Sequence, residues 1–164
     1  MVRIGGRSLG SGGDACFDDG MEDEIRDRLI GSVGRLIARA GSSRPVPGEW
    51  TPGTVLGHIA EVDEQVWLVR LNLMVHAARK AEDPPRFQWW EPDPVETAVR
   101  YEGWEFEDCA QRVLEARVNL VWRLRELTAE DWHARAMHST WGEVDVRGLL
   151  QHVFNHDDEH LASL

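Results

Sequence analysis

Apolar side chains recur every three or four residues in four segments of the chain, which is the spacing of an amphipathic helix. In the first segment the apolar positions are Ile25, Leu29, Val33, Leu36 and Ala40. The four expected helices span about residues 21–40, 51–79, 96 or 104 to 127, and 144 to the end. No segment shows a convincing strand alternation, and no internal repeat is present. The pattern therefore predicts an all-α protein, an antiparallel four-helix bundle.

The connections between these helices differ in length. Thr51 followed by Pro52 predicts the start of the second helix, because threonine caps a helix and proline lacks an N–H that the first turn would leave unpaired. That helix ends before a pair of prolines, and an aromatic loop follows over residues 86–94. We expect the long link over residues 80–103, between the second and third helices, to cross one end of the bundle.

The length of the chain fits one domain. Residues 1–20 are rich in glycine and lack a periodic apolar pattern, so we expect a disordered N-terminal arm there. Residues 21–164 then form one bundle domain.

The chain is strongly acidic, with a net charge of −11 from 29 acidic and 18 basic residues. This charge repels phosphate backbones and anionic lipids, so we expect no nucleic-acid partner and no membrane partner. No apolar run reaches the length of about 20 residues that spans a bilayer. The two cysteines, Cys16 and Cys109, lie far apart and suggest no disulfide framework, which favours a cytoplasmic location.

Histidines on the last expected helix are the first candidates for site chemistry. His152, His156 and His160 are spaced four apart, so neighbouring rings lie one helical turn, about 6 Å, from each other. Two such imidazoles can bind one cation at the roughly 2.0–2.1 Å that zinc requires. On a helical wheel, His156 and His160 fall inside or beside the apolar stripe, whereas His152 lies further toward solvent. His156 and His160 are therefore the better pair of ligands, although such a pair alone is a weak signal.

His58 borders the inward face of the second helix near its N-terminal end, whereas the histidines of the last helix lie near its C-terminal end. If the two helices run parallel, these positions lie at opposite ends of the bundle. If a long crossover reverses one helix, they meet. The residues alone leave both arrangements open, and a lone histidine on an apolar edge is more often a packed core residue. The other three histidines show no pattern with partners and are expected on the surface or in loops; they are His76, His133 and His138.

Two further residues are candidates for a supporting role. Glu61 lies three residues after His58 and is a candidate to orient a ligand or to act as a base, although a solvated acidic face is the favoured interpretation. Arg117 falls in the apolar stripe of the third helix, where a guanidinium needs an anionic partner. It would either clamp a substrate carboxylate or pair with an acidic residue of a neighbouring helix, and we favour the pairing.

Two segments carry a family resemblance. Residues 50–61 read WTPGTVLGHIAE, and residues 142–160 read GEVDVRGLLQHVFNHDDEH. In this order they resemble the second and final helices of the DinB/YfiT-like superfamily of metal-binding four-helix bundles. The resemblance implies the crossover topology and a divalent metal held by three histidines, which are His58, His156 and His160. His152 matches a family histidine that usually lies just outside the ligand set. Many relatives continue with Arg-Gly-Gln, whereas residues 161–163 here read Leu-Ala-Ser, so a candidate substrate contact is missing.

The resemblance also implies a range of activities. Similar proteins include transferases and isomerases that use low-molecular-weight bacterial thiols, and others described as metal-dependent hydrolases. We therefore expect a small-molecule substrate, zinc or nickel as the metal, and a thiol as the co-substrate of an S-transferase. A non-catalytic, stress-associated metal-binding protein is the alternative. A third hypothesis is a metal-free module that dimerises through the aromatic residues at 87–90; homodimers are common among similar proteins.

Overall fold

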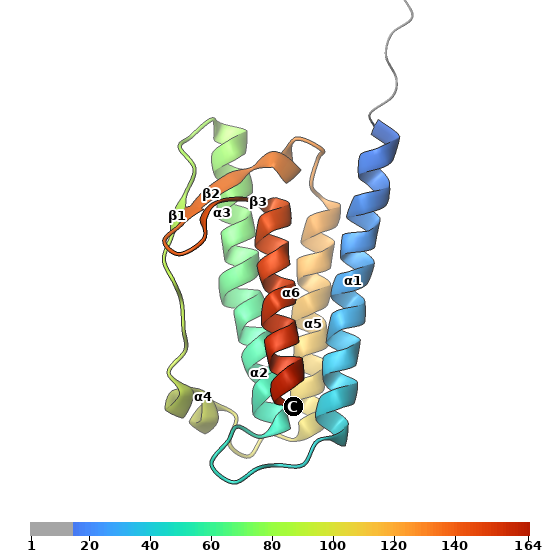
Figure 1. Ribbon diagram of the computed structural model, residues 1–164, viewed down its shortest axis with the longest axis vertical. Coiled ribbons are helices and arrows are strands. Elements are labelled where there is room, and N and C mark those ends of the chain that lie inside the picture. Colours follow the sequence, from blue (N-terminus) through green and yellow to red (C-terminus); the bar gives the residue numbers. More distant parts are fainter. Residues whose placement is uncertain (1–14) are drawn as a thin grey trace, which may run out of the picture.

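The computed structural model describes residues 15–164, and a bundle of long helices dominates it (Figure 1). The helices are α1 (Ala15–Ser42), α2 (Pro52–Val62), α3 (Leu68–Lys80), α4 (Pro94–Arg100), α5 (Phe106–Arg125) and α6 (Val146–Ser163). A π-helical segment, η1 (Asp63–Trp67), joins α2 to α3 in one continuous rod. The bundle consists of α1, the α2–α3 rod, α5 and α6, so the expected all-α four-helix bundle is confirmed. No helix among residues 15–164 is long and apolar enough to cross a membrane.

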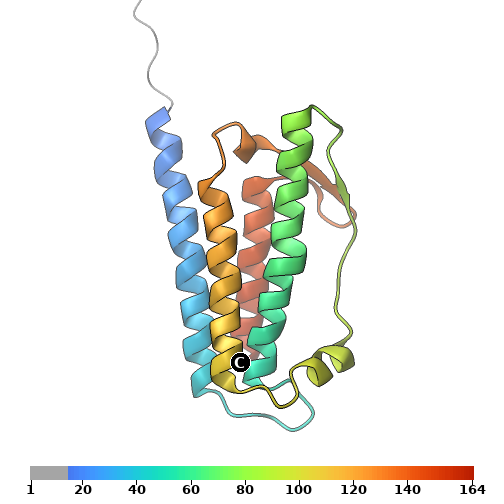
Figure 2. The same ribbon diagram turned by 180° about the vertical axis from the view of Figure 1, so that it is seen from behind.

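The order of helix directions brings the start of α2 beside the end of α6. As drawn in Figure 1, α1 runs downward, the α2–α3 rod and α5 both run upward, and α6 runs downward again. The expected antiparallel order is therefore wrong for the rod and α5, which run parallel because the connection between them returns to the lower end of the bundle. Figure 2 shows from behind that α5 lies between α1 and the α2–α3 rod, and α5 packs against both. The connection over residues 81–105 returns along the outside of the rod before α5 begins. The long crossover is therefore confirmed, but it runs along the length of the bundle and does not cross one end of it as expected. Of the two arrangements left open by the sequence, the antiparallel one is therefore correct for α2 and α6.

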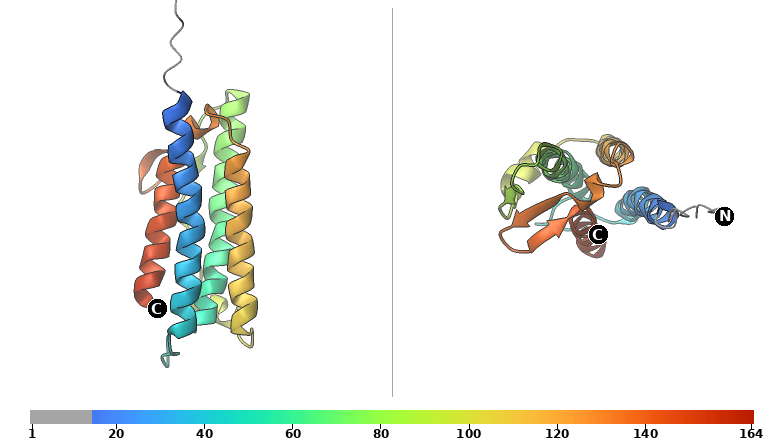
Figure 3. Two further views of the ribbon diagram at one scale, coloured as in Figure 1. Left: turned by 90° about the vertical axis from the view of Figure 1, so that its right-hand side faces the viewer. Right: turned by 90° about the horizontal axis from the view of Figure 1, so that it is seen from above.

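A small sheet, absent from the expectations, covers one side of the bundle. Its strands are β1 (Arg86–Phe87), β2 (Arg135–His138) and β3 (Gly142–Asp145). β1 pairs with β2 in parallel, with Phe87 opposite His138, and β2 pairs with β3 as an antiparallel hairpin. Seen from above, the hairpin reaches past the ends of α3 and α6 (Figure 3, right). Strands of two to four residues are too short to show an alternating pattern, so sequence analysis missed them.

Two expected boundaries also differ from the structure. α1 begins at Ala15, so it includes residues that were assigned to the N-terminal arm; the rest of that arm, residues 1–14, lies outside the described residues. Two starts were left open for the third helix: about residue 104 agrees with α5, which begins at Phe106, whereas Glu96 belongs to a separate short helix, α4. Between α4 and α5 Tyr101 turns inward and is buried, so the chain leaves the helix at α4 to pack this ring against the bundle.

Local hydrogen bonds set the starts of α2 and α6, the two helices that carry the candidate ligands. The Thr51 hydroxyl accepts a hydrogen bond from the Thr54 N–H at 3.0 Å, which confirms the predicted cap before Pro52. At the start of α6, the Asp145 carboxylate accepts from the Gly148 N–H at 2.8 Å. Both caps satisfy an N–H that the first helical turn leaves without a backbone partner.

The α4 segment packs closely against α2 at Gly57. The Tyr101 hydroxyl donates a hydrogen bond to the Gly57 carbonyl at 2.8 Å. A Cβ atom at position 57 would lie 2.3 Å from a carbon of the Tyr101 ring, so only glycine leaves room for this contact. The contact fixes the returning chain next to His58, the following residue.

Arg117 connects four helices in the centre of the bundle. Its fully buried guanidinium donates a hydrogen bond to Asp63 Oδ2 on η1 at 2.7 Å. The same guanidinium donates to both carboxylate oxygens of Asp157 on α6, at 2.7 and 2.9 Å. It also donates to the Leu29 carbonyl of α1, and Ser32 of α1 donates to Asp157 at 2.6 Å. Burial lowers the pKa of Arg117, but the two carboxylates outweigh burial and raise it above its ordinary value, so the guanidinium stays charged.

We predict that Arg117→Met destabilises the protein by about 3–5 kcal/mol, because it leaves Asp63 and Asp157 buried without a cation. Urea unfolding followed by circular dichroism measures the change. Arg125→Met, which removes an exposed guanidinium from the same helix, is the matched control and should change the free energy of unfolding by less than about 0.5 kcal/mol. Equal losses in the two variants would contradict the assignment.

Candidate metal centre

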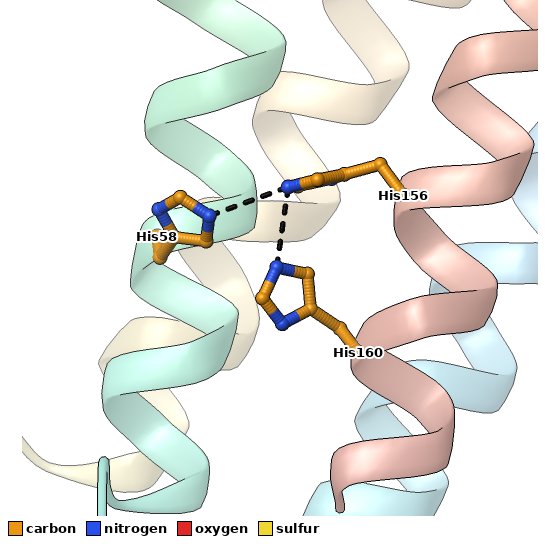
Figure 4. A group of neighbouring side chains, drawn as sticks. All are labelled: His58, His156 and His160. Carbon is orange, nitrogen blue, oxygen red and sulfur yellow. Dashed lines mark hydrogen bonds between the residues drawn. The ribbon is translucent and has the colours of Figure 1, made fainter. Parts of the chain in front are cut away.

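Three histidine side chains from two helices meet at one point between α2 and α6 (Figure 4). The Nε2 atom of His156 lies 3.3 Å from Nε2 of His58 and 3.2 Å from Nε2 of His160. One ligand atom from each of the three residues lies within 4.8 Å of the others. The structure therefore brings together the three residues that sequence analysis named as metal ligands.

The Arg117 network sets which way α6 presents these rings. Asp157 is held toward the bundle centre by Arg117 and is almost completely buried. Because successive residues of a helix point about 100° apart, this orientation turns the preceding residue, His156, toward α2. His160 lies one turn further along the same face and reaches the same point.

The spacing of the nitrogens fits a divalent cation. Ligands at about 2.0–2.1 Å from a tetrahedral metal lie about 3.3–3.4 Å from each other. The two Nε2–Nε2 distances of 3.3 and 3.2 Å agree with this value. Imidazole nitrogens suit zinc, nickel and copper, and three protein ligands leave a position for a water molecule or a substrate.

Burial keeps the rings in the neutral form that binds metal. Burial, together with the smaller effect of neighbouring histidine charges, lowers the pKa of His58 to about 3 and that of His156 to about 2. Burial also lowers the pKa of His160. At neutral pH the three rings are therefore uncharged, and no proton has to be displaced from them before a cation binds.

Aromatic packing orients His58 and His156. Their Nδ1 atoms are buried and have no hydrogen-bond partner among the described residues, whereas the second nitrogen of a metal-bound histidine usually donates to an acceptor. The His58 ring lies against Trp50, with 5.0 Å between centroids, and the edge of His156 meets the Trp67 ring at 6.1 Å. Tryptophans thus restrain these imidazoles where a carboxylate commonly does so.

The three histidines line one wall of a cavity of about 520 Å³, a volume typical of small-molecule sites. Much of the remaining wall is indole, contributed by Trp50, Trp67, Trp89, Trp90 and Trp141. Trp50 lies in the loop before α2 and Trp67 in η1, whereas Trp89 and Trp90 belong to the returning segment and Trp141 to the turn of the β2–β3 hairpin. The sheet that sequence analysis missed therefore supplies part of the cavity.

The remaining histidines divide into two groups. His152 lines the cavity and stacks on Trp141 with 3.5 Å between ring centroids, so it lies beside the three-histidine cluster without joining it. His138 stacks on the other face of Trp141 at 3.7 Å and is buried, so its expected surface position is wrong. The reason is strand β2, which turns this side chain inward. His76 and His133 are exposed, as expected.

Neither supporting candidate reaches the cavity. Glu61 is buried, and its carboxylate accepts two hydrogen bonds from Arg100 of α4, both at 2.7 Å. The expected solvated face is therefore wrong, because α4 covers this side of α2, and Glu61 does not line the cavity as a base would. Arg117 is engaged by Asp63 and Asp157 in the core, so the favoured pairing is correct and the substrate clamp is not.

Sequence analysis missed Arg70 of α3, the arginine that lines the cavity. A signal was present, because Val62, Val66 and Arg70 are spaced four apart and so share one face of the rod. In the structure this face lines the cavity, whereas the sequence pattern assigned it to the apolar core.

The comparisons with known proteins agree with this fold. The family model of the DinB superfamily matches residues 23–164, so the chain belongs to the DinB superfamily. Among solved structures, the chain is similar to YfiT from Bacillus subtilis, described as "a probable metal-dependent hydrolase with an unusual four-helix bundle topology". The two share 16% identity at a TM-score of 0.65, over 97% of this chain and 88% of the other, which supports the fold. The comparison with curated proteins gives no match.

We predict that protein purified without a polyhistidine tag binds one zinc or nickel ion per chain. His58→Ala, His156→Ala and His160→Ala should each lower the affinity at least about 100-fold, since loss of a supporting residue alone commonly costs 10- to 100-fold. Competition with a chromophoric chelator measures the affinity. His76→Ala, the loss of an exposed imidazole on α3, is the matched control and should bind as the unmodified protein does. Unchanged affinity in all three cavity variants would rule out the site.

Proposed function

We propose that the protein is a divalent-metal-dependent enzyme that transfers a low-molecular-weight thiol to a small electrophilic substrate. The observation that carries the proposal is the convergence of three neutral imidazoles, His58, His156 and His160, on the wall of an aromatic cavity. A structural metal site commonly has all its positions filled by protein. Here three ligands face a space large enough for a small organic molecule, which favours catalysis over a purely structural role.

A cation bound by these imidazoles would hold a thiol as its thiolate, the nucleophilic form, at neutral pH. The residues of the chain do the rest. The tryptophan walls reduce contact with water and offer flat faces on which a planar electrophile can stack. His58 and His156 stay unprotonated because they are buried, so they remain able to bind the cation.

The acidic residues of the cavity favour a thiol over water as the nucleophile. Glu91 and Glu159 line the cavity, and both are exposed at its edge. Glu61, the nearest buried carboxylate on α2, is occupied by Arg100. Water attack assisted by a buried carboxylate therefore lacks that carboxylate among the described residues that line the cavity. A thiol has less need of one, because its pKa of about 8.5 already lies near neutrality.

A metal-dependent hydrolase is the second candidate, favoured by the printed description of YfiT as a probable metal-dependent hydrolase. The same three histidines would serve it, with a metal-bound water in place of the thiol. A non-catalytic metal-binding protein would use the histidines only to join α2 and α6.

We predict thiol-dependent turnover by protein loaded with zinc or nickel. The assay supplies bacillithiol or mycothiol with 1-chloro-2,4-dinitrobenzene and follows the thioether by absorbance. His156→Ala should reduce kcat/KM at least about 100-fold, toward the uncatalysed rate, because the thiol loses its activating cation. His76→Ala should retain the activity of the unmodified protein.

Each outcome separates the candidates. Equal rates for His156→Ala and the unmodified protein would overturn the enzymatic proposal. Hydrolysis of an activated ester without added thiol, abolished by the same substitution, would establish the hydrolase. Stoichiometric metal that raises the melting temperature, with no turnover in either assay, would establish the non-catalytic protein.

A further inference from the structure

Arg70 is a buried cation without an anionic partner. Its side chain is almost fully enclosed, with 8% of the residue exposed, and it donates one hydrogen bond, from Nη2 to the Gln88 carbonyl at 2.7 Å. Among residues 20–164, whose side chains are described, no carboxylate pairs with it, although the chain carries a net charge of −11. The other deeply buried guanidinium, Arg117, has two carboxylates. A buried charge without a counter-ion is costly, so such a group marks a place where an anion is expected to bind.

Aromatic rings surround the Arg70 guanidinium. Its central carbon lies 5.3 Å from the centroid of Phe87, 5.6 Å from Trp67 and 5.8 Å from Trp141. Cation–π contacts of this kind stabilise the charge without neutralising it. A guanidinium has five N–H donors, of which the bond to Gln88 uses one, so a planar pair of donors remains for a ligand.

Arg70 and the three histidines lie at different ends of the same cavity. Arg70 follows His58 by twelve residues along the α2–α3 rod, which places their Cα atoms roughly 18 Å apart along the axis at 1.5 Å per residue. Helical side chains lean back toward the N-terminus, so the guanidinium lies nearer to the histidines than its Cα atom does. Trp67 stands between them and contacts both His156 and Arg70.

We infer that Arg70 binds the carboxylate of an elongated substrate whose reacting group lies at the three histidines. This inference rests on the proposed function for the identity of the reacting end. A single negative charge fits best, because Arg70 is the only lysine or arginine among the described residues that line the cavity. The exposed Glu91 and Glu159 at the edge would oppose a dianion such as a phosphate. The tryptophans between the two ends select an apolar or aromatic middle section.

The test compares two probes of nearly the same shape, the anion 2-naphthylacetate and the neutral amide 2-naphthylacetamide. Isothermal titration calorimetry measures each dissociation constant at pH 7, on metal-loaded protein and on protein treated with a chelator. In both preparations the acid should bind about 10- to 100-fold more tightly than the amide, the gain expected from a charge-assisted hydrogen-bonded pair. Arg70→Gln should abolish the preference by weakening the acid alone, and Arg70→Lys should retain part of it.

Arg86→Gln is the matched control, because it makes the same change of charge on exposed β1, outside the cavity. It should leave the preference intact. Equal affinities for acid and amide would overturn the inference, as would a preference that survives in Arg70→Gln. A preference seen only with metal would place the carboxylate on the cation and would also overturn it. If Arg70→Gln does not fold, the affinities of the two probes for chelator-treated, unmodified protein still test the inference. Absence of thiol turnover would not affect this binding result.

Discussion

The buried interaction of Arg117 with Asp63 and Asp157 is the constraint on which the site depends. A guanidinium inside the bundle is satisfied only where both carboxylates reach it, so the network excludes other registers of α6 against η1. Asp157 directly follows His156, and Asp63 lies five residues after His58. The same ion pairs that join the helices therefore set the height and rotation at which the imidazoles meet. The π-helical segment begins at Asp63, which places the irregular turn at this junction.

Much of the fold was predictable, because it rests on local patterns. The apolar repeat identified the long helices, Thr51 and Pro52 identified the start of α2, and the spacing of His156 and His160 identified one side of the site. That His58 meets these two histidines was not predictable from local patterns, since it depends on the direction of α6 after a crossover of about 25 residues. Family resemblance supplied that direction. The sheet and the inward turn of His138 rest on pairing between β1 and β2, which lie about 50 residues apart and leave no periodic signal.

For the charged residues, too, local patterns were informative, whereas contacts between distant segments could not be predicted. Position on a helical wheel indicated that Arg117 needs a partner, but could not say whether Asp63, Asp157 or a substrate provides it. Glu61 was misjudged because α4 covers it, and α4 belongs to the crossover.

The cavity combines neutral imidazoles at one end, indole walls and a guanidinium at the other. This arrangement suits a molecule that is anionic at one end and reactive at the other, with the tryptophans of the cavity in contact with the section between its ends.

The central claim is that three imidazoles from α2 and α6 bind one cation, and anomalous X-ray diffraction from crystals grown with zinc tests it most directly. Data collected above and below the zinc absorption edge locate the ion without reference to the protein atoms. The account predicts one strong anomalous peak per chain, at about 2.0–2.1 Å from the Nε2 atoms of His58, His156 and His160. A map with no peak between these rings at saturating zinc, or with the ion bound elsewhere while the rings stay together, would contradict it.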